Sequence, residues 1–223
     1  MARADWPPER LRQALGLYVL TDRGLSRGRS EVEIIQAALA GGATAVQLRW
    51  KVGPLAEAVH AGRALRELCR ETGALFVVND RVDLALALEA DGVHLGVEDL
   101  PLEEAHQLAG DRLILGFSPS TLDEALAAER AGADYLGIGP VYGTATKADA
   151  GPAVGLEHVR QIVQAVSIPV VGIGGITAAN AQPVIEAGAA GVAVISAVVA
   201  ADDPRAAAAA LRAVVDEALA GRR

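Results

Sequence analysis

The sequence predicts an α/β protein built as a single (β/α)8 barrel, the TIM-barrel architecture, over residues 1–223, with residues 1–14 as a short N-terminal extension or helix. Three observations predict it. Eight short apolar runs recur, most of them too apolar to alternate with polar residues, as expected for parallel strands covered on both faces. Helical patterns separate these runs, and no linker or low-complexity break divides the chain. Such a barrel carries its active site at the carboxyl ends of its strands.

The predicted strands follow one another as short runs separated by helical segments. They are LYVLTD (17–22), AVQLRW (45–50), LFVVND (75–80), GVHL (92–95), LILGFS (113–118), YLGIGP (135–140), PVVGIGG (169–175) and GVAVIS (191–196). Amphipathic patterns predict helices over 31–40, 55–71, 121–131, 156–165 and 178–187, and the alanine run 206–210 belongs to a terminal helix. Four of these patterns end at the usual C-cap glycine, at Gly41, Gly73, Gly132 and Gly188. The alternative is an open doubly wound sheet. Its Rossmann form requires a Gly-x-Gly-x-x-Gly turn after the first strand, where this chain has Arg23-Gly24.

The composition narrows the function classes. Hydrophobic residues make up 52% of the chain and aromatic residues only 3%, so the core must be aliphatic. A net charge of −8 without a basic run argues against nucleic acid and against an anionic membrane as partners. No segment has the length of a transmembrane helix, the N-terminus lacks the apolar stretch of a signal peptide, and the single Cys69 excludes an internal disulfide. We expect a cytoplasmic enzyme acting on small molecules, and the sequence leaves a homo-oligomer open.

The predicted strand ends gather an unusual set of polar residues. The chain has only two lysines, Lys51 and Lys147, and both follow a predicted strand, whereas its other eighteen basic residues are arginines. Cations at the mouth of an acidic protein, and a glycine pair before a helix, are suited to binding a phosphorylated substrate. The carboxylates are suited to a hard divalent ion such as Mg²⁺. The strand-end residues are Asp22, Arg49, Lys51, Asn79, Asp80, Asp99, Ser118, Thr144, Thr146, Lys147, Gly174, Gly175 and Ser196.

Seven segments resemble one enzyme family closely. They are VQLR (46–49), VNDRVD (78–83), DGVHLGVED (91–99), GIGPVYGTATK (137–147), VGL (154–156), GIGGI (172–176) and GVAVIS (191–196). Short pieces such as Gly-Gly-Ile are weak signals. Asn79-Asp80, then Asp99, then Thr-x-Thr-Lys, in this order and at strand ends, is a strong one. From about residue 18 to residue 204 the sequence resembles the thiamine phosphate synthases.

The resemblance implies a Mg²⁺-dependent transferase. The family joins 4-amino-2-methyl-5-(diphosphooxymethyl)pyrimidine to a thiazole phosphate, carboxylated or not, and releases diphosphate and thiamine phosphate by a dissociative mechanism. Carried over by motif, the catalytic residues are Lys147, Ser118 and Arg49. The residues implied to bind the pyrimidine diphosphate are Gln47, Leu48, Arg49, Trp50, Lys51, Asn79, Ser118 and Lys147. Those implied for the thiazole phosphate are Thr144, Ala145, Thr146, Gly175, Ile195 and Ser196, and Asp80 with Asp99 would ligate one Mg²⁺.

Two departures from the family pattern concern the pyrimidine end. Trp50 stands where the family usually has Glu, and Pro119-Ser120 follows Ser118 in place of a small residue and His. Side chains alternate along a strand, so Trp50 has the opposite parity to Gln47 and Arg49 and should point outward toward the helices.

Several roles and functions stay open at this stage. Asp22 suits a catalytic role, a helix cap or a salt bridge, His94 is expected to be a packed, hydrogen-bonded histidine, and Tyr18 is expected in the core. A thiazole tautomerase on the same barrel is one rival function, although its catalytic histidine would stand at Ser120. A non-catalytic phosphate- or thiamine-binding protein is a second, and it would not need the two carboxylates. Another phosphate-binding barrel enzyme, for example one of tryptophan synthesis, is a third, but the acid residues that such enzymes use are not evident.

Overall fold

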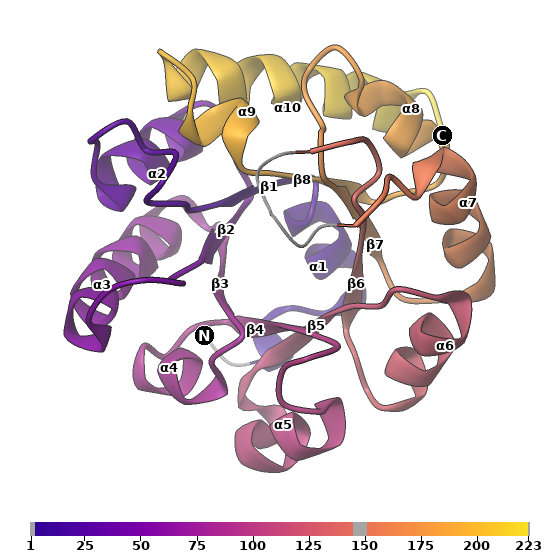
Figure 1. The fold of residues 1–223 in the computed structure, drawn as a ribbon, viewed down its shortest axis with the longest axis horizontal. Helices are drawn as coiled ribbons and strands as arrows, with labels where there is room; N and C mark the ends of the chain where they lie inside the picture. Colours follow the sequence, from indigo (N-terminus) through magenta and orange to yellow (C-terminus); the bar gives the residue numbers. More distant parts are fainter. Residues whose placement is uncertain (1–2, 145–150, 223) are drawn as a thin grey trace.

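The computed structural model describes residues 3–144 and 151–222 and shows a closed barrel of eight parallel strands, which confirms the predicted fold. Figure 1 looks down the barrel, with the helices arranged as a ring around the strands. In chain order the strands are β1 (Leu17–Leu20), β2 (Ala45–Leu48), β3 (Leu75–Asn79), β4 (Gly92–Gly96), β5 (Ile114–Ser118), β6 (Tyr135–Ile138), β7 (Val170–Ile173) and β8 (Gly191–Val194). Strand β8 pairs with β1 and closes the barrel, with Tyr18 opposite Ala193.

The helices lie where the alternating pattern places them. They are α1 (Pro8–Ala14), α2 (Glu31–Ala40), α3 (Leu55–Thr72), α4 (Val82–Ala87), α5 (Leu102–Ala109), α6 (Leu122–Arg130), α7 (Gly155–Ala165), α8 (Ala181–Glu186), α9 (Ser196–Val199) and α10 (Pro204–Ala220), with short 3-10 turns η1 (Arg3–Asp5) and η2 (Gly110–Arg112). Helix α8 begins later than the predicted residue 178, because the Asn180 side chain accepts a hydrogen bond from the Thr177 peptide N–H at 2.7 Å and holds a turn there. No helix among residues 3–144 and 151–222 combines the length and apolar character needed to span a membrane.

Strand parity divides the core into two layers. Side chains such as Val46, Leu48 and Val78 pack between the strands and the surrounding helices. Side chains such as Leu75 and Ile114 fill the barrel interior. This division follows from the alternation of side chains along each strand, and it determines which strand residues can reach a site inside the barrel.

The N-terminal segment closes the amino end of the barrel. Trp6 and Leu11 are each 4% exposed, and they pack in the same cluster as the interior residues Tyr18 and Leu75. Figure 1 shows α1 behind the strands, seen through the barrel. With this end covered, the interior opens at the carboxyl ends of the strands.

Candidate active site

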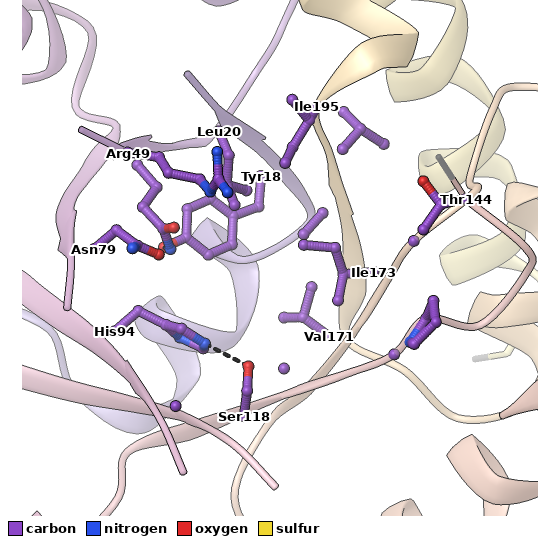
Figure 2. A pocket seen from close by; sticks show the side chains of 18 of the residues that line it. Tyr18, Leu20, Arg49, Asn79, His94, Ser118, Thr144, Val171, Ile173 and Ile195 are labelled. Atoms are coloured by element: carbon purple, nitrogen blue, oxygen red, sulfur yellow. Dashed lines mark hydrogen bonds between the residues drawn. The ribbon is translucent and has the colours of Figure 1, made fainter. Parts of the chain in front are cut away.

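A cavity of about 410 Å³ occupies the carboxyl mouth of the barrel, and residues on or just after all eight strands line it. Its two sides differ in character. Figure 2 shows Arg49, Asn79, His94 and Ser118 on one side, whereas the apolar side chains of β7 and the β8 exit lie opposite. The cavity can therefore hold a polar, charged group and a flat apolar ring together.

An ion pair holds Arg49 at the exit of β2. Arg49 Nη1 lies 2.7 Å from Asp22 Oδ2, and both side chains are less than 15% exposed. Asp22 Oδ1 also accepts the peptide N–H of Leu25 at 3.2 Å. Of the roles left open for Asp22, the structure shows the salt bridge. Arg49 Nε is buried without a hydrogen-bond partner among the described residues, so this guanidinium retains a donor for a ligand.

A second cation stands beside two carboxylates at the exits of β2, β3 and β4. Lys51 Nζ lies 2.5 Å from Asp80 Oδ2. Asp99 Oδ2 accepts the peptide N–H of Gly96 at 2.7 Å. Partial burial raises the pKa of the Asp99 carboxyl, and the neighbouring Asp80 carboxylate raises this pKa further. The two carboxylates thus lie close enough to repel each other when both are ionised.

This carboxylate pair has the chemistry of a magnesium site. Mg²⁺ is usually held by one or two carboxylates together with phosphate oxygens and water. Here two carboxylates lie beside a cavity with room for such oxygens, and a bound cation would relieve their mutual repulsion. Asp80 and Asp99 would hold the ion. Among the described residues no group of three or more His, Cys, Asp or Glu side chains could hold a metal, so phosphate and water oxygens would have to complete the coordination.

The opposite side of the mouth is a glycine turn after β7. Gly174 has φ 95° and Gly175 φ 67°, both in the left-handed region that favours glycine. A Cβ on Gly174 would lie 2.6 Å from Pro140 Cα, and one on Gly175 would lie 2.7 Å from the Gly143 carbonyl oxygen. The turn must therefore be glycine, and both glycines line the cavity beside Thr144, Ile195 and Ser196. Their carbonyl oxygens already accept hydrogen bonds, from the Tyr142 peptide N–H and from Asn180 Nδ2.

A row of hydrogen bonds crosses the cavity floor. Gln47 Nε2 donates to Tyr18 Oη at 2.7 Å, and Tyr18 Oη lies 3.1 Å from Tyr135 Oη. His94 Nδ1 lies 3.0 Å from Tyr135 Oη, and His94 Nε2 lies 2.8 Å from Ser118 Oγ, the bond dashed in Figure 2. We call Gln47, Tyr18, Tyr135, His94 and Ser118 the polar row. Burial raises the pKa of both tyrosines, so each keeps its hydroxyl proton at neutral pH.

Comparisons with known proteins agree on one family. A family model described as thiamine monophosphate synthase (TMP-TENI) matches residues 17–198. A thiamine-phosphate synthase of Moorella thermoacetica is 56% identical over 202 residues, which cover 91% of this chain and 96% of that relative. A solved thiamine phosphate pyrophosphorylase from Pyrococcus furiosus superposes with a TM-score of 0.88 at 53% identity, covering 94% of this chain and 99% of that one. The chain belongs to the thiamine monophosphate synthase family.

Most residues that the family resemblance implies meet in this one cavity. From the sets given above, the lining includes Gln47, Arg49, Lys51, Asn79, Asp80, Asp99, Ser118, Thr144, Gly175, Ile195 and Ser196. Ala145, Thr146 and Lys147 lie outside the described residues. Tyr135 also lines the cavity but was not predicted from the sequence, although it begins β6 two residues before Gly137 and this spacing puts both on the interior face.

Two residues of the thiamine monophosphate synthase set do not reach the cavity. Leu48 is fully buried between the sheet and the helices, and Trp50 packs against that same layer with the Arg23 guanidinium 4.4 Å from its ring centroid. The family motif includes both residues in the pyrimidine site, but their side chains alternate with those of Gln47 and Arg49 and are not part of the cavity lining. The outward orientation expected for Trp50 is confirmed.

Proposed function

We propose that this protein is a thiamine phosphate synthase that joins 4-amino-2-methyl-5-(diphosphooxymethyl)pyrimidine to a thiazole phosphate, releasing diphosphate. One observation carries the proposal: a single cavity has cations with a carboxylate pair on one side and a glycine turn on the other. Two phosphorylated substrates need two such anion sites in one space. Membership of the family supports the same conclusion.

The charged side of the cavity would bind the pyrimidine diphosphate. Arg49 and Lys51 supply fixed positive charge, and Asn79 and Ser118 supply neutral hydrogen-bond groups. Mg²⁺ on Asp80 and Asp99, when bound, would neutralise part of the diphosphate charge. Negative charge grows on the diphosphate as its bond to the pyrimidine methylene carbon breaks, so the held cations stabilise the transition state more than the ground state.

The glycine side would fix the thiazole phosphate. The peptide N–H of Gly175 and the side chains of Thr144 and Ser196 would hold its phosphate, with Ala145 and Thr146 implied by sequence, while Ile195 would pack against the ring. The thiazole nitrogen then forms a bond to the methylene carbon that the diphosphate has left. The attacking nitrogen carries no proton, so this step needs no general base, and placing the two reactants in line is the main task of the protein.

The rival functions fit the cavity less well. A tautomerase of this type would have its catalytic histidine at position 120, but this chain has Ser120, whose peptide N–H donates to Glu124 Oε2 at 2.7 Å at the start of α6. A simple binding protein would not need two carboxylates beside Lys51, because without a metal ion they weaken the binding of anions.

The assignment of Asp80 and Asp99 to a Mg²⁺ site can be tested by ligand-induced stabilisation as well as by turnover. We expect Mg²⁺ with inorganic diphosphate to raise the melting temperature of the wild type and to have a much smaller effect on Asp99→Ala. We also expect excess chelator to stop turnover. Full turnover in chelator, or full activity of Asp99→Ala, would refute the metal assignment.

The dissociative order of events has its own test. Cationic character on the pyrimidine methylene carbon predicts that an electron-withdrawing group on the pyrimidine ring slows turnover sharply, while the affinity for the diphosphate stays similar. An analogue that reacts at the normal rate would contradict bond breaking ahead of bond making.

A further inference from the structure

The hydrogen-bond direction of the polar row follows from the orientation of the Gln47 amide. Gln47 Nε2 can only donate, so Tyr18 Oη accepts there. Tyr18 is 2% exposed and Tyr135 is 1% exposed, and their hydroxyls face each other at 3.1 Å. The Tyr18 proton must go to Tyr135, because otherwise it would be buried without an acceptor at a cost of about 1–3 kcal/mol. Tyr135 then donates to His94 Nδ1.

The direction continues to the other side of the cavity. With Nδ1 accepting, the neutral His94 ring carries its proton on Nε2 and donates it to Ser118 Oγ at 2.8 Å. The Ser118 hydroxyl proton is thereby left to donate into the cavity that Ser118 lines. At the other end, Gln47 Oε1 is buried with no partner among the described residues, although Gln47 also lines the cavity. The row therefore ends in one acceptor and one donor.

The two ends are coupled. If the Gln47 amide turned over, Tyr18 would donate to it, every bond in the row would reverse, and Ser118 would have to donate to His94 instead of to a ligand. Oxygen atoms of a diphosphate ester only accept hydrogen bonds. A ligand that accepts from Ser118 thus favours the direction in which Gln47 Oε1 faces the cavity as an acceptor.

We propose that the polar row positions Gln47 as an acceptor and Ser118 as a donor, so that this site selects a pyrimidine with an amino group over one with an oxo group. Tyr18, Tyr135 and His94 act as positioning residues. The ligand part rests on the proposed function. An amino N–H would satisfy the buried Gln47 Oε1, whereas an oxo group would place two acceptors together and leave both unpaired.

The direction of the row is measured directly in the free protein. Correlation of imidazole protons with ring ¹⁵N shifts reports which nitrogen carries the proton, and His94→Gln assigns the signal among the four histidines. We expect the neutral Nε2–H form. A neutral Nδ1–H form would overturn the proposal.

Selectivity is measured as the ratio of the equilibrium dissociation constants of the oxo and the amino pyrimidine diphosphates. Both are measured with Mg²⁺ and without the thiazole phosphate, so that no product forms. We expect the wild type to prefer the amino compound by at least about 100-fold, since unpaired buried groups are strongly rejected. In Tyr135→Phe the row is cut, so this preference should fall at least tenfold. Tyr142→Phe removes a tyrosine hydroxyl that donates to the Asn180 carbonyl oxygen outside the row, and it should keep the preference.

The outcomes separate the two levels of the argument. A folded Tyr135→Phe that keeps the full preference, or a wild type without any preference, overturns the proposed selection. A wild type with the Nε2–H form and the expected preference that makes no thiamine phosphate supports the polar row and refutes the proposed reaction.

Discussion

Asp80 combines an unfavourable backbone conformation with a carboxylate that pairs with Lys51 and repels Asp99. Its φ of 62° is in the left-handed region, where few residues other than glycine lie, and its peptide N–H donates to the His94 carbonyl oxygen at 2.8 Å. Its carboxylate faces Lys51 and raises the pKa of Asp99. Strain of this kind costs about 1–3 kcal/mol and is typical of positions that serve binding rather than stability.

The raised pKa of Asp99 gives a signed prediction for stability. A carboxyl whose pKa is higher in the folded than in the unfolded state stabilises the fold below the unfolded pKa, and this stability is lost as pH rises through the folded pKa. Without Mg²⁺, we expect Asp99→Asn to melt higher than the wild type at pH 7, by about 1–3 °C, and the gain to vanish in acid. A lower melting temperature at every pH would contradict the repulsion between Asp80 and Asp99.

Lys147 is predicted from sequence alone to stabilise the departing diphosphate. Removing one preorganised charge donor costs about 2–4 kcal/mol of transition-state stabilisation, so kcat/KM of Lys147→Ala should fall by about 30-fold to 10³-fold. Lys147→Arg should also be poor, because a planar fork does not replace a compact ammonium. Near-normal kcat/KM in Lys147→Ala would show that the role is wrong.

At the scale of an element, the alternation of side chains along β2 and the two residues after it determines which of them reach the cavity. Gln47 and Arg49 face the cavity, whereas Trp50 faces the helices and stacks on Arg23, which also pairs with Glu57 at 2.9 Å. We expect Trp50→Glu to leave KM for both substrates nearly unchanged and to lower the free energy of unfolding by about 1–3 kcal/mol.

The matched control for this prediction is Val52→Glu. Val52 is 80% exposed on the same segment, so a carboxylate there should change neither quantity. A large rise in KM for the pyrimidine diphosphate in Trp50→Glu, without loss of stability, would place the indole in the site.

The turn between β7 and α8 gives a second prediction at this scale. Gly175→Ala should be destabilising and should raise KM for the thiazole phosphate more than KM for the pyrimidine diphosphate, because a Cβ would clash with the Gly143 carbonyl oxygen at 2.7 Å. Gly73→Ala is the control: Gly73 has a similar φ of 73° with nothing within 4 Å, so only stability should fall, by about 1 kcal/mol. Equal KM changes for both substrates of Gly175→Ala would argue against a phosphate site there.

At the scale of the whole molecule, sequence reasoning succeeded where the information is local. The barrel could be predicted because each strand is a short apolar run, and Arg49, Asp80 and Ser118 could be brought together because parallel strands of one barrel end on the same face. The Asp22–Arg49 pair is intermediate, since both residues stood out but their pairing depends on side-chain geometry.

The polar row could not be predicted, for a physical reason. Tyr18 on β1 meets Tyr135 on β6 across the barrel interior, and these strands are not neighbours in the sheet. Contacts of this kind depend on the stagger of the whole barrel and on side-chain length, which no spacing in the sequence gives. The packing of Trp6 at the amino end of the barrel is likewise a contact that no spacing in the sequence gives.

The central claim, that one cavity binds both phosphorylated substrates and joins them, is tested most directly by the reaction itself. The purified protein would be incubated with the pyrimidine diphosphate, the thiazole phosphate and Mg²⁺, and thiamine phosphate and diphosphate would be measured together. We predict that the two products appear in a one-to-one ratio and only when both substrates are present. Absence of thiamine phosphate, while both substrates bind, would contradict the claim.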